Sequence, residues 1–201
     1  MSLFIESIRI QNKRAWLLDL HQQRMDAVFS YFGKNNPHLL KNYLPKGEYT
    51  QEGIYKWRVC YDLSGFIHSQ VQAYTLNTPG GFSLVKADQL NYSFKYENRE
   101  ALNKLEKSAG GNTAIFYQNR KITDSSYSNL IFEKDMEWYT PETFLLNGVM
   151  RQYLLNTHRI KSRDISLDNL HEFSSFQMIN AMIPFGTQKY CIDFIQNLFR
   201  D

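Results

Sequence analysis

A lysine enclosed by aromatic residues is the first candidate for chemistry in this chain of 201 residues. Residues 92–99 read YSFKYENR, so that Lys95 lies between Phe94 and Tyr96, after a strand-like run and before a helix-like one. A lysine amine can act as a nucleophile or a base when burial lowers its pKa. Most lysines are solvated surface charges, however, and an isolated FKY segment is typical of an edge strand. A catalytic role for Lys95 therefore depends on motifs elsewhere in the chain.

Four further motifs supply groups that a lysine-bound cofactor requires. Upstream, residues 21–24 read HQQR, and a helix brings His21 and Arg24 together because they are three positions apart. Downstream come ITDSSYSN at 122–129, LNGVMR at 146–151 and INAM at 179–182. A lysine for a Schiff base, a carboxylate for a ring nitrogen and backbone N–H groups for a phosphate are the parts that a pyridoxal 5'-phosphate (PLP) site needs. The order of the motifs thus indicates a PLP site.

Taken together, these motifs resemble those of the fold-type IV PLP enzymes, the class IV aminotransferase family. The resemblance extends over residues 4–184. Within the family the chain is most similar to the aminodeoxychorismate lyase branch, because Lys95 is followed by Asn98 and Arg99 in a K-x-x-N-R pattern and because Asn180 opens the last motif. Branched-chain transaminases carry small residues and a tyrosine after the lysine instead.

The resemblance implies a role for three charged residues. Lys95 would hold PLP as a Schiff base and then move the substrate proton. Arg24 would bind the cofactor phosphate, for which a planar fork of donors is suited. Asp124 would face the ring nitrogen and keep it protonated, although the family more often has glutamate there. On local pattern alone, Arg24 is more typical of a solvated helix charge and Asp124 of an ordinary Asx turn.

The resemblance also implies that uncharged residues bind the cofactor and substrate. Asn129 belongs to the Asp124 motif, and backbone N–H groups at a helix start beginning with Gly148 would bind phosphate. A plain Asn-Gly helix entry is the alternative for that motif. The last motif would provide a second phosphate and substrate loop. The residues implied are Asn129, Gly148, Val149, Met150 and Asn180 for the cofactor, and Asn180, Ala181 and Met182 for the substrate.

Composition excludes several other classes of protein. Hydrophobic residues make up 43% and aromatic residues 15% of the chain, which is typical of a globular protein. The net charge of +3 is spread without a Lys/Arg run, so nucleic acid is not expected as a partner. The two cysteines form neither a disulfide framework nor a CxxC site, and the five histidines lie in separate segments, so no metal is expected. With no long apolar run, we expect a cytoplasmic protein without membrane contact.

The length allows one domain or two small ones. The resemblance implies an α+β protein of two small mixed α/β domains, of the D-amino acid aminotransferase-like type, with a shortened N-terminal domain that lacks the usual first strands. The boundary is expected between residues 84 and 85, giving an N-terminal domain 1–84 and a larger PLP-binding domain 85–201. Strands are expected at both ends of residues 4–18, at 55–61, 67–75, 82–86, 113–117, 130–133 and 176–179. Helices are expected at 20–32, capped by Asp19, and at 97–107, 149–156, 167–173 and 192–199.

Three functions follow from these observations. The first is a lyase like aminodeoxychorismate lyase, which releases pyruvate and forms 4-aminobenzoate for folate synthesis. The second is an aminotransferase of branched-chain or D-amino acids, and the third is an inactive scaffold or binding protein of the same fold. The resemblance implies a homodimer that acts on a small-molecule amine, with the cofactor between its two domains. A departure at Tyr61 and Asp62, where relatives often carry arginine and glycine near the substrate carboxylate, affects the substrate more than the cofactor.

Overall fold

The computed structural model describes residues 2–47 and 52–196, and it divides them into two compact units. The first unit runs up to Leu76 and includes Phe94–Asn98, whereas the second includes Asn77–Ser93 and continues from Arg99. The sequence-based boundary between residues 84 and 85 falls inside strand β5 (Phe82–Lys86), which lies wholly in the second unit. The fold is mixed α/β, with few helices and many strands.

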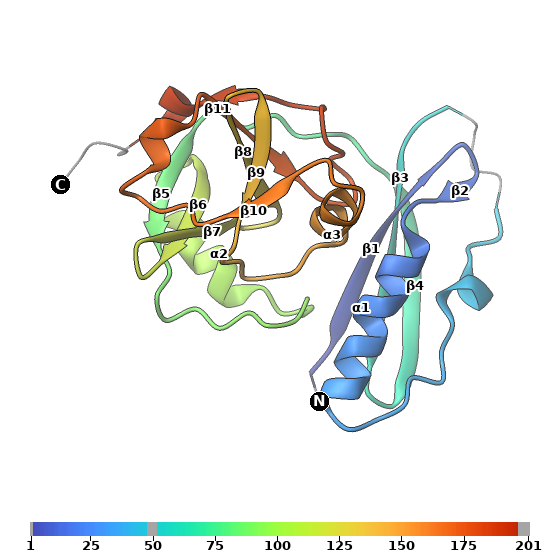
Figure 1. Ribbon diagram of the computed structural model, residues 1–201. Coiled ribbons are helices and arrows are strands. Elements are labelled where there is room, and N and C mark those ends of the chain that lie inside the picture. Colours follow the sequence, from blue (N-terminus) through green and yellow to red (C-terminus); the bar gives the residue numbers. More distant parts are fainter. Residues whose placement is uncertain (1, 48–51, 197–201) are drawn as a thin grey trace. The chain divides into compact units, whose positions relative to one another are not determined.

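The first unit is an antiparallel sheet covered by one long helix. Its strands lie in the order β2 (Arg14–Ala15), β1 (Phe4–Gln11), β3 (Tyr55–Asp62) and β4 (Gly65–Ala73). Figure 1 shows α1 (Leu18–Tyr31) along one face of this sheet, and a 3₁₀ turn, η1 (Leu40–Tyr43), follows it. The predicted hairpin is confirmed, because Asn12 and Lys13 form its turn with positive φ angles of 52° and 59°.

Helix α1 begins earlier than the sequence predicted and without the predicted cap. The residue before it is Leu17, with φ of 55° and no side-chain cap, so Asp19 lies in the first turn and not at the cap. The helix buries one stripe of side chains, which packs on the sheet with the inward residues of β1 and β3. The buried core comprises Phe4, Ile8, Ile10, Met25, Val28, Phe29, Leu40, Trp57, Val59 and Tyr61.

The segment that carries Lys95 belongs to the first unit although its neighbours in sequence belong to the second. The carbonyl of Lys95 accepts a 2.9 Å hydrogen bond from the amide of Ile5, and Glu97 donates to the carbonyl of Leu3 at 2.8 Å. An antiparallel bridge pairs Phe4 with Tyr96. The strand-like run expected before Lys95 is wrong, since this short segment is irregular and is held against the start of β1.

The second unit is built on a larger mixed sheet. Among the described residues its strands lie in the order β10 (Lys161–Arg163), β9 (Glu137–Pro141), β8 (Asn129–Lys134), β7 (Lys121–Ser125), β6 (Thr113–Gln118), β5 and β13 (Ile195–Gln196). Strand β11 (Ser175–Ile179) pairs with β8 and with the short β12 (Tyr190–Cys191). Two helices, α2 (Glu100–Lys107) and α3 (Val149–Asn156), belong to this unit.

Two predicted helices of the second unit are wrong. Residues 167–173 contain only the 3₁₀ turn η2 (Leu170–Glu172), and the predicted closing helix becomes η3 (Ile192–Phe194) followed by β13. Strand β13 pairs in parallel with β5, and this pairing outweighs the helical spacing of its apolar residues. The remainder of that predicted helix lies outside the described residues.

Aromatic and branched residues from the sheet strands fill the main core of the second unit. Phe82 and Phe176, for example, meet edge to face with ring centroids 4.8 Å apart. No helix among the described residues is long and apolar enough to cross a membrane. The main core comprises Phe82, Ile115, Ile122, Leu130, Phe132, Ile165, Leu170, Phe173, Phe176, Met178, Tyr190, Ile192 and Ile195.

Candidate active site

A buried carboxylate in β1 joins the two residues of the upstream motif in the first unit. Both oxygens of Glu6 accept from Arg24: Nε donates to Oε1 at 2.9 Å and Nη2 to Oε2 at 2.5 Å. His21 Nδ1 lies 2.5 Å from the same Oε2. Glu6 and His21 are fully buried and Arg24 nearly so. Because His21 and Arg24 are three positions apart on one helix, both side chains reach the same carboxylate.

The charges in this cluster depend on one another. Burial raises the pKa of Glu6, but the positive charge of Arg24 and the contact with His21 outweigh burial and bring this pKa down to about 2. Burial lowers the pKa of His21, despite the opposing effect of Glu6. Near neutral pH the arrangement is therefore a carboxylate, a guanidinium and an uncharged imidazole that donates from Nδ1.

Lys95 acts electrostatically on the same cluster. Its charge is among the influences that lower the pKa of His21, and both residues belong to the first unit. His21 Nε2 is buried and accepts or donates no hydrogen bond among the described residues. Lys95, His21 and Arg24 therefore share one electrostatic environment, with Glu6 as its negative centre.

Asp124 is the corresponding buried carboxylate of the second unit. It lies in β7, where Oδ2 accepts from the amides of Leu145 and Leu146, both at 2.9 Å, and Oδ1 accepts from Asn129 Nδ2 at 2.8 Å. Burial raises the pKa of Asp124 to about 6, against the lowering effect of these hydrogen bonds and of the Arg151 guanidinium. Asp124 is thus mostly ionised at neutral pH and has the local hydrogen bonds that an ionised buried carboxylate requires.

Asn129 connects Asp124 to the start of α3. Its Nδ2 also donates to the carbonyl of Leu146 at 2.8 Å, so one side-chain amide holds both a carboxylate and a loop. Its Oδ1 lies against Gly148, where a Cβ atom would come within 2.0 Å of it. The Asn129 amide is thus engaged with the protein itself, and position 148 has no room for a side chain.

Helix α3 begins directly after this contact. Gly148 precedes its first turn in an extended conformation, with no side-chain cap and no acidic residue in the first turn. Val149 and Met150 are buried, so their part of the helix start offers backbone and not side-chain polar groups. Uncapped N–H groups at a helix N-terminus attract anions such as phosphate.

Asn180 shapes its own loop. Its Oδ1 accepts from the amides of Met182 and Ile183 at 2.7 and 2.9 Å, and its Nδ2 donates to the carbonyl of Tyr127 and to Ser128 Oγ at 3.0 and 2.9 Å. Met182 is buried and Ala181 is partly exposed. Asn180 therefore joins the last motif to the Asp124 motif by protein contacts.

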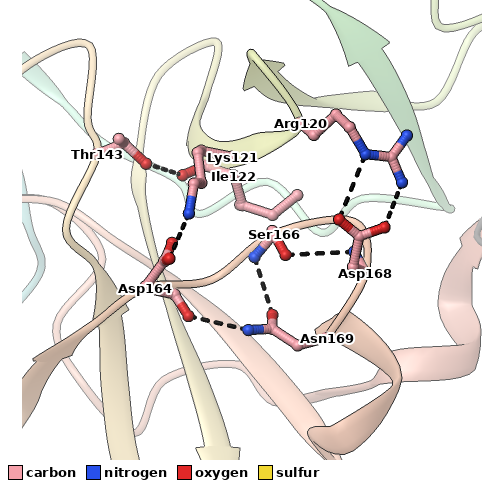
Figure 2. A network of polar contacts seen from close by, with 8 residues as sticks. All are labelled: Arg120, Lys121, Ile122, Thr143, Asp164, Ser166, Asp168 and Asn169. Atoms are coloured by element: carbon pink, nitrogen blue, oxygen red, sulfur yellow. Dashed lines mark hydrogen bonds and ion pairs between the residues drawn. The ribbon is translucent and has the colours of Figure 1, made fainter.

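A surface network fixes the strand that carries Asp124. Figure 2 shows Arg120 paired with Asp168, and Lys121 with Asp164, at the start of β7. In the same network the hydroxyl of Thr143 donates to the carbonyl of Ile122 at 2.7 Å. Thr143 lies just before the two amides that contact Asp124, so β7 and the loop that supplies its donors are tied together twice.

The residues present fit a PLP group. A carboxylate accepts about four hydrogen bonds, and Asp124 accepts three from the described part of the chain, which leaves capacity for the N–H of a protonated ring. The start of α3, in the same unit, presents backbone N–H groups suited to a phosphate. In the first unit, Glu6 holds the guanidinium of Arg24 through Nε and Nη2.

The sequence analysis missed Glu6 and the donors of Asp124. Glu6 shares the strand face of Phe4, Ile8 and Ile10, all buried, and an acidic residue on an apolar face is a readable signal. The amides of Leu145 and Leu146 have no such signal, since every residue has one. The structure brings Asp124, Asn129 and Gly148 together in the second unit, and Glu6, His21 and Arg24 in the first.

The departure at Tyr61 and Asp62 has a structural explanation. Tyr61 packs in the first core, stacked on Phe29 with ring centroids 6.2 Å apart, and burial raises its pKa. Asp62 accepts from the amides of Ser64 and Gly65 at 2.7 and 3.1 Å and so closes the turn between β3 and β4. In this chain both residues have partners within the first unit.

Comparison with known proteins places these features in a family. The sequence model of the amino-transferase class IV family matches residues 92–186. A protein of Haemophilus influenzae without an assigned function is 31% identical over 185 residues, covering 88% of this chain and 96% of the relative. A structure from Haemophilus somnus, provisionally described as a 4-amino-4-deoxychorismate lyase, is 28% identical with a TM-score of 0.84, covering 92% of this chain and 98% of the other.

A more distant structure shares the fold. An aminotransferase from Brucella abortus, solved with PLP bound, is 15% identical with a TM-score of 0.69, covering 97% of this chain and 81% of the other.

The chain is a PLP enzyme of the fold that these structures share, and it belongs to the amino-transferase class IV family. Its cofactor is pyridoxal 5'-phosphate, and its activity is of the lyase or aminotransferase type. The family resemblance seen in the sequence is thereby confirmed.

Glu6→Gln tests the buried cluster of the first unit. We expect the free energy of unfolding at pH 7 to fall by about 3 kcal/mol, because the variant removes the buried negative charge that Glu6 presents to the mostly buried Arg24. Urea unfolding followed by circular dichroism measures this change. The folded pKa of Glu6, about 2, lies below the unfolded value, so its contribution is present above that unfolded value and is lost as pH falls toward about 2. The two proteins should therefore converge in acid.

Glu97→Gln is the matched control, since Glu97 pairs with Arg58 in the same unit with both side chains partly exposed. It should cost less than about 1 kcal/mol. Equal losses in the two variants would contradict a special role for the buried cluster.

Gly148→Ala tests the close approach to Asn129. The new Cβ must displace an amide that is held by Asp124 and Leu146, so we expect PLP affinity to fall by about tenfold or more. Gly80→Ala is the control, because nothing lies within 4 Å of a Cβ there. Titration of the apo-protein with PLP measures both, and equal dissociation constants would show that Asn129 moves without consequence.

Proposed function

We propose that this enzyme is a lyase that converts 4-amino-4-deoxychorismate to 4-aminobenzoate and pyruvate, a reaction of folate synthesis. The observation that carries the proposal is the similarity to the Haemophilus somnus structure, which extends over nearly all of both chains. Lys95, Asn98 and Arg99 give further support as the K-x-x-N-R pattern that resembles the lyase branch.

Arg99 has a local role that suits this pattern. Its Nη2 donates to the carbonyl of Ser126 at 2.5 Å, which fixes the entrance to α2 against the turn that follows Asp124. Arg99 is therefore linked by this hydrogen bond to the backbone of the Asp124 motif, within the second unit.

In the proposed reaction the cofactor, when bound, supplies an electron-withdrawing ring that stabilises negative charge on the substrate carbon. Lys95 provides the amine that takes the proton from C4 of the substrate. Asp124 would accept a hydrogen bond from the ring nitrogen and keep it protonated, which would strengthen that withdrawal. By the family resemblance, Arg24, oriented by Glu6, would bind the phosphate, and the backbone N–H groups of Val149 and Met150 would bind it too. Loss of pyruvate leaves an aromatic ring, which drives the reaction forward.

An aminotransferase of branched-chain or D-amino acids is the second candidate. The same residues would serve it, and a structural neighbour from Thermotoga maritima, 14% identical, is provisionally described as a branched-chain amino acid aminotransferase. The candidates differ in one requirement, because a transaminase needs a keto acid as amino acceptor and the lyase does not. From the family resemblance, we also propose that the enzyme is a homodimer in the cytoplasm.

Pyruvate release from aminodeoxychorismate, without any keto acid, tests the function. We expect release by the wild type and none by Lys95→Ala, which should also lose the visible absorption band of the PLP Schiff base. Lys104→Ala, at an exposed position of α2, is the control and should retain both. Glutamate-dependent amination of a keto acid, with no pyruvate released from aminodeoxychorismate, would overturn the lyase in favour of the transaminase.

The pH dependence of PLP binding tests the role of Asp124. The pKa of this carboxyl is about 6, so PLP affinity should decline as pH falls below about 6, where Asp124 becomes protonated and loses its charge. Asp124→Asn should bind PLP weakly at neutral pH and lack this decline. Protonation of the PLP phosphate changes the affinity equally in both proteins, so it does not affect the comparison between them. Parallel pH profiles would exclude Asp124 as the partner of the ring nitrogen.

A further inference from the structure

Arg151 is a buried arginine that the proposed chemistry does not use. It lies in the first turn of α3, and only 5% of its surface is exposed. Burial lowers its pKa, while Asp124 acts in the opposite direction. Burying a guanidinium is costly unless hydrogen bonds and a counter-charge compensate it. The contacts of Arg151 therefore indicate what it does.

These contacts fall on residues 140–147, from the end of β9 to the loop before α3. Nε lies 3.2 Å from Thr140 Oγ1, Nη2 donates to the carbonyl of Pro141 at 3.1 Å, and Nη1 donates to Asn147 Oδ1 at 3.1 Å. The guanidinium carbon also lies 4.4 Å from the ring centroid of Phe144, within cation–π range. One side chain thus contacts both ends and the middle of residues 140–147.

The same segment carries groups that belong to the cofactor site. The amides of Leu145 and Leu146 donate to Asp124, and the carbonyl of Leu146 accepts from Asn129. Gly148, which follows directly, opens α3. A shift of this segment would change the donors of the Asp124 carboxylate and the place of the phosphate-binding amides together.

We propose that Arg151 is a positioning residue for PLP, which holds residues 140–148 so that the hydrogen bonds to Asp124 and the N–H groups at the start of α3 keep their places. This inference rests on the cofactor roles given above for Asp124 and the start of α3. It does not depend on which substrate the enzyme uses.

The geometry requires arginine and not only a positive charge. A guanidinium directs five N–H groups in one plane at fixed angles, which suits three acceptors on three different residues and a ring packed against its face. A lysine carries the same charge on a single nitrogen and cannot reach these acceptors in one arrangement. Arg151→Lys therefore removes the fork and keeps the charge.

The test is the dissociation constant of PLP for apo-protein, measured by absorbance titration without substrate. Each variant is titrated at a temperature that lies the same number of degrees below its own Tm. A loss of stability then does not by itself change the measured dissociation constant. We expect Arg151→Lys to weaken binding by about tenfold, the change that corresponds to one lost hydrogen bond of a charged group. Arg163→Lys is the matched control, because Arg163 also stacks on aromatic rings of this unit, at Tyr139 and Phe173, and should stay within about twofold.

Asn147→Ala keeps the test decisive if Arg151→Lys does not fold. It retains the buried arginine with its bonds to Thr140 and Pro141 and removes only the acceptor nearest Gly148. We expect weaker PLP binding in the same direction. A dissociation constant equal to that of the wild type, in either variant and whatever its Tm, would overturn the inference and leave Arg151 a purely structural residue. A wild type that binds PLP but releases no pyruvate would contradict the lyase proposal alone.

Discussion

A carboxylate can be buried only where N–H donors replace the water that it loses, and much of the second unit is arranged to meet this requirement at Asp124. Two of its three donors are backbone amides of one loop, and the third is a side chain that also holds that loop. The loop must therefore follow one path. That path determines where α3 begins and why residue 148 is a glycine.

The first unit meets the same requirement differently, and the difference appears in the charges. Glu6 is paired with a guanidinium, so its pKa falls although it is buried. Asp124 receives uncharged donors, so burial dominates and its pKa rises to about 6. A full positive charge close by stabilises the ionised form more than amide dipoles do. Glu6 is thus fixed as an anion over the physiological range, whereas Asp124 titrates near the lower end of it.

Sequence patterns predicted the helices and strands better than they predicted the long-range pairing between them. Alternation located β1, β3 and β5, and the Asn147–Gly148 pair located α3, because period and turn chemistry are local properties. The segments 167–173 and 192–199 both have helical spacing. The first contains only a short 3₁₀ turn, and the described residues 192–196 of the second form a short turn and a strand that pairs with β5, a long-range interaction that spacing does not encode. The hydrogen bond between Lys95 and the start of β1 also joins residues far apart in the sequence, so local spacing does not predict it.

In the candidate site, too, the sequence predicted residues better than it predicted their contacts. Lys95, Arg24 and Asp124 were predicted as site residues because charged residues in an ordered set of motifs are recognisable in a sequence. That Asn129 and Asn180 contact the cofactor stays a prediction. Their side-chain amides are bound by the protein's own groups, and only the folded chain reveals those partners. Arg151 was visible as part of a motif, yet its contacts follow from the path of residues 140–147.

The discontinuity of the first unit has a consequence for how the protein is made. Residues 94–98 complete this unit, and the chain between Leu76 and Phe94 belongs to the other one. During synthesis from the N-terminus, the first sheet and α1 emerge from the ribosome well before the segment that bonds to the start of β1. Until that segment arrives, the amide of Ile5 and the carbonyl of Leu3 lack their native partners. The first unit therefore reaches its final form only after the chain has begun to build the second.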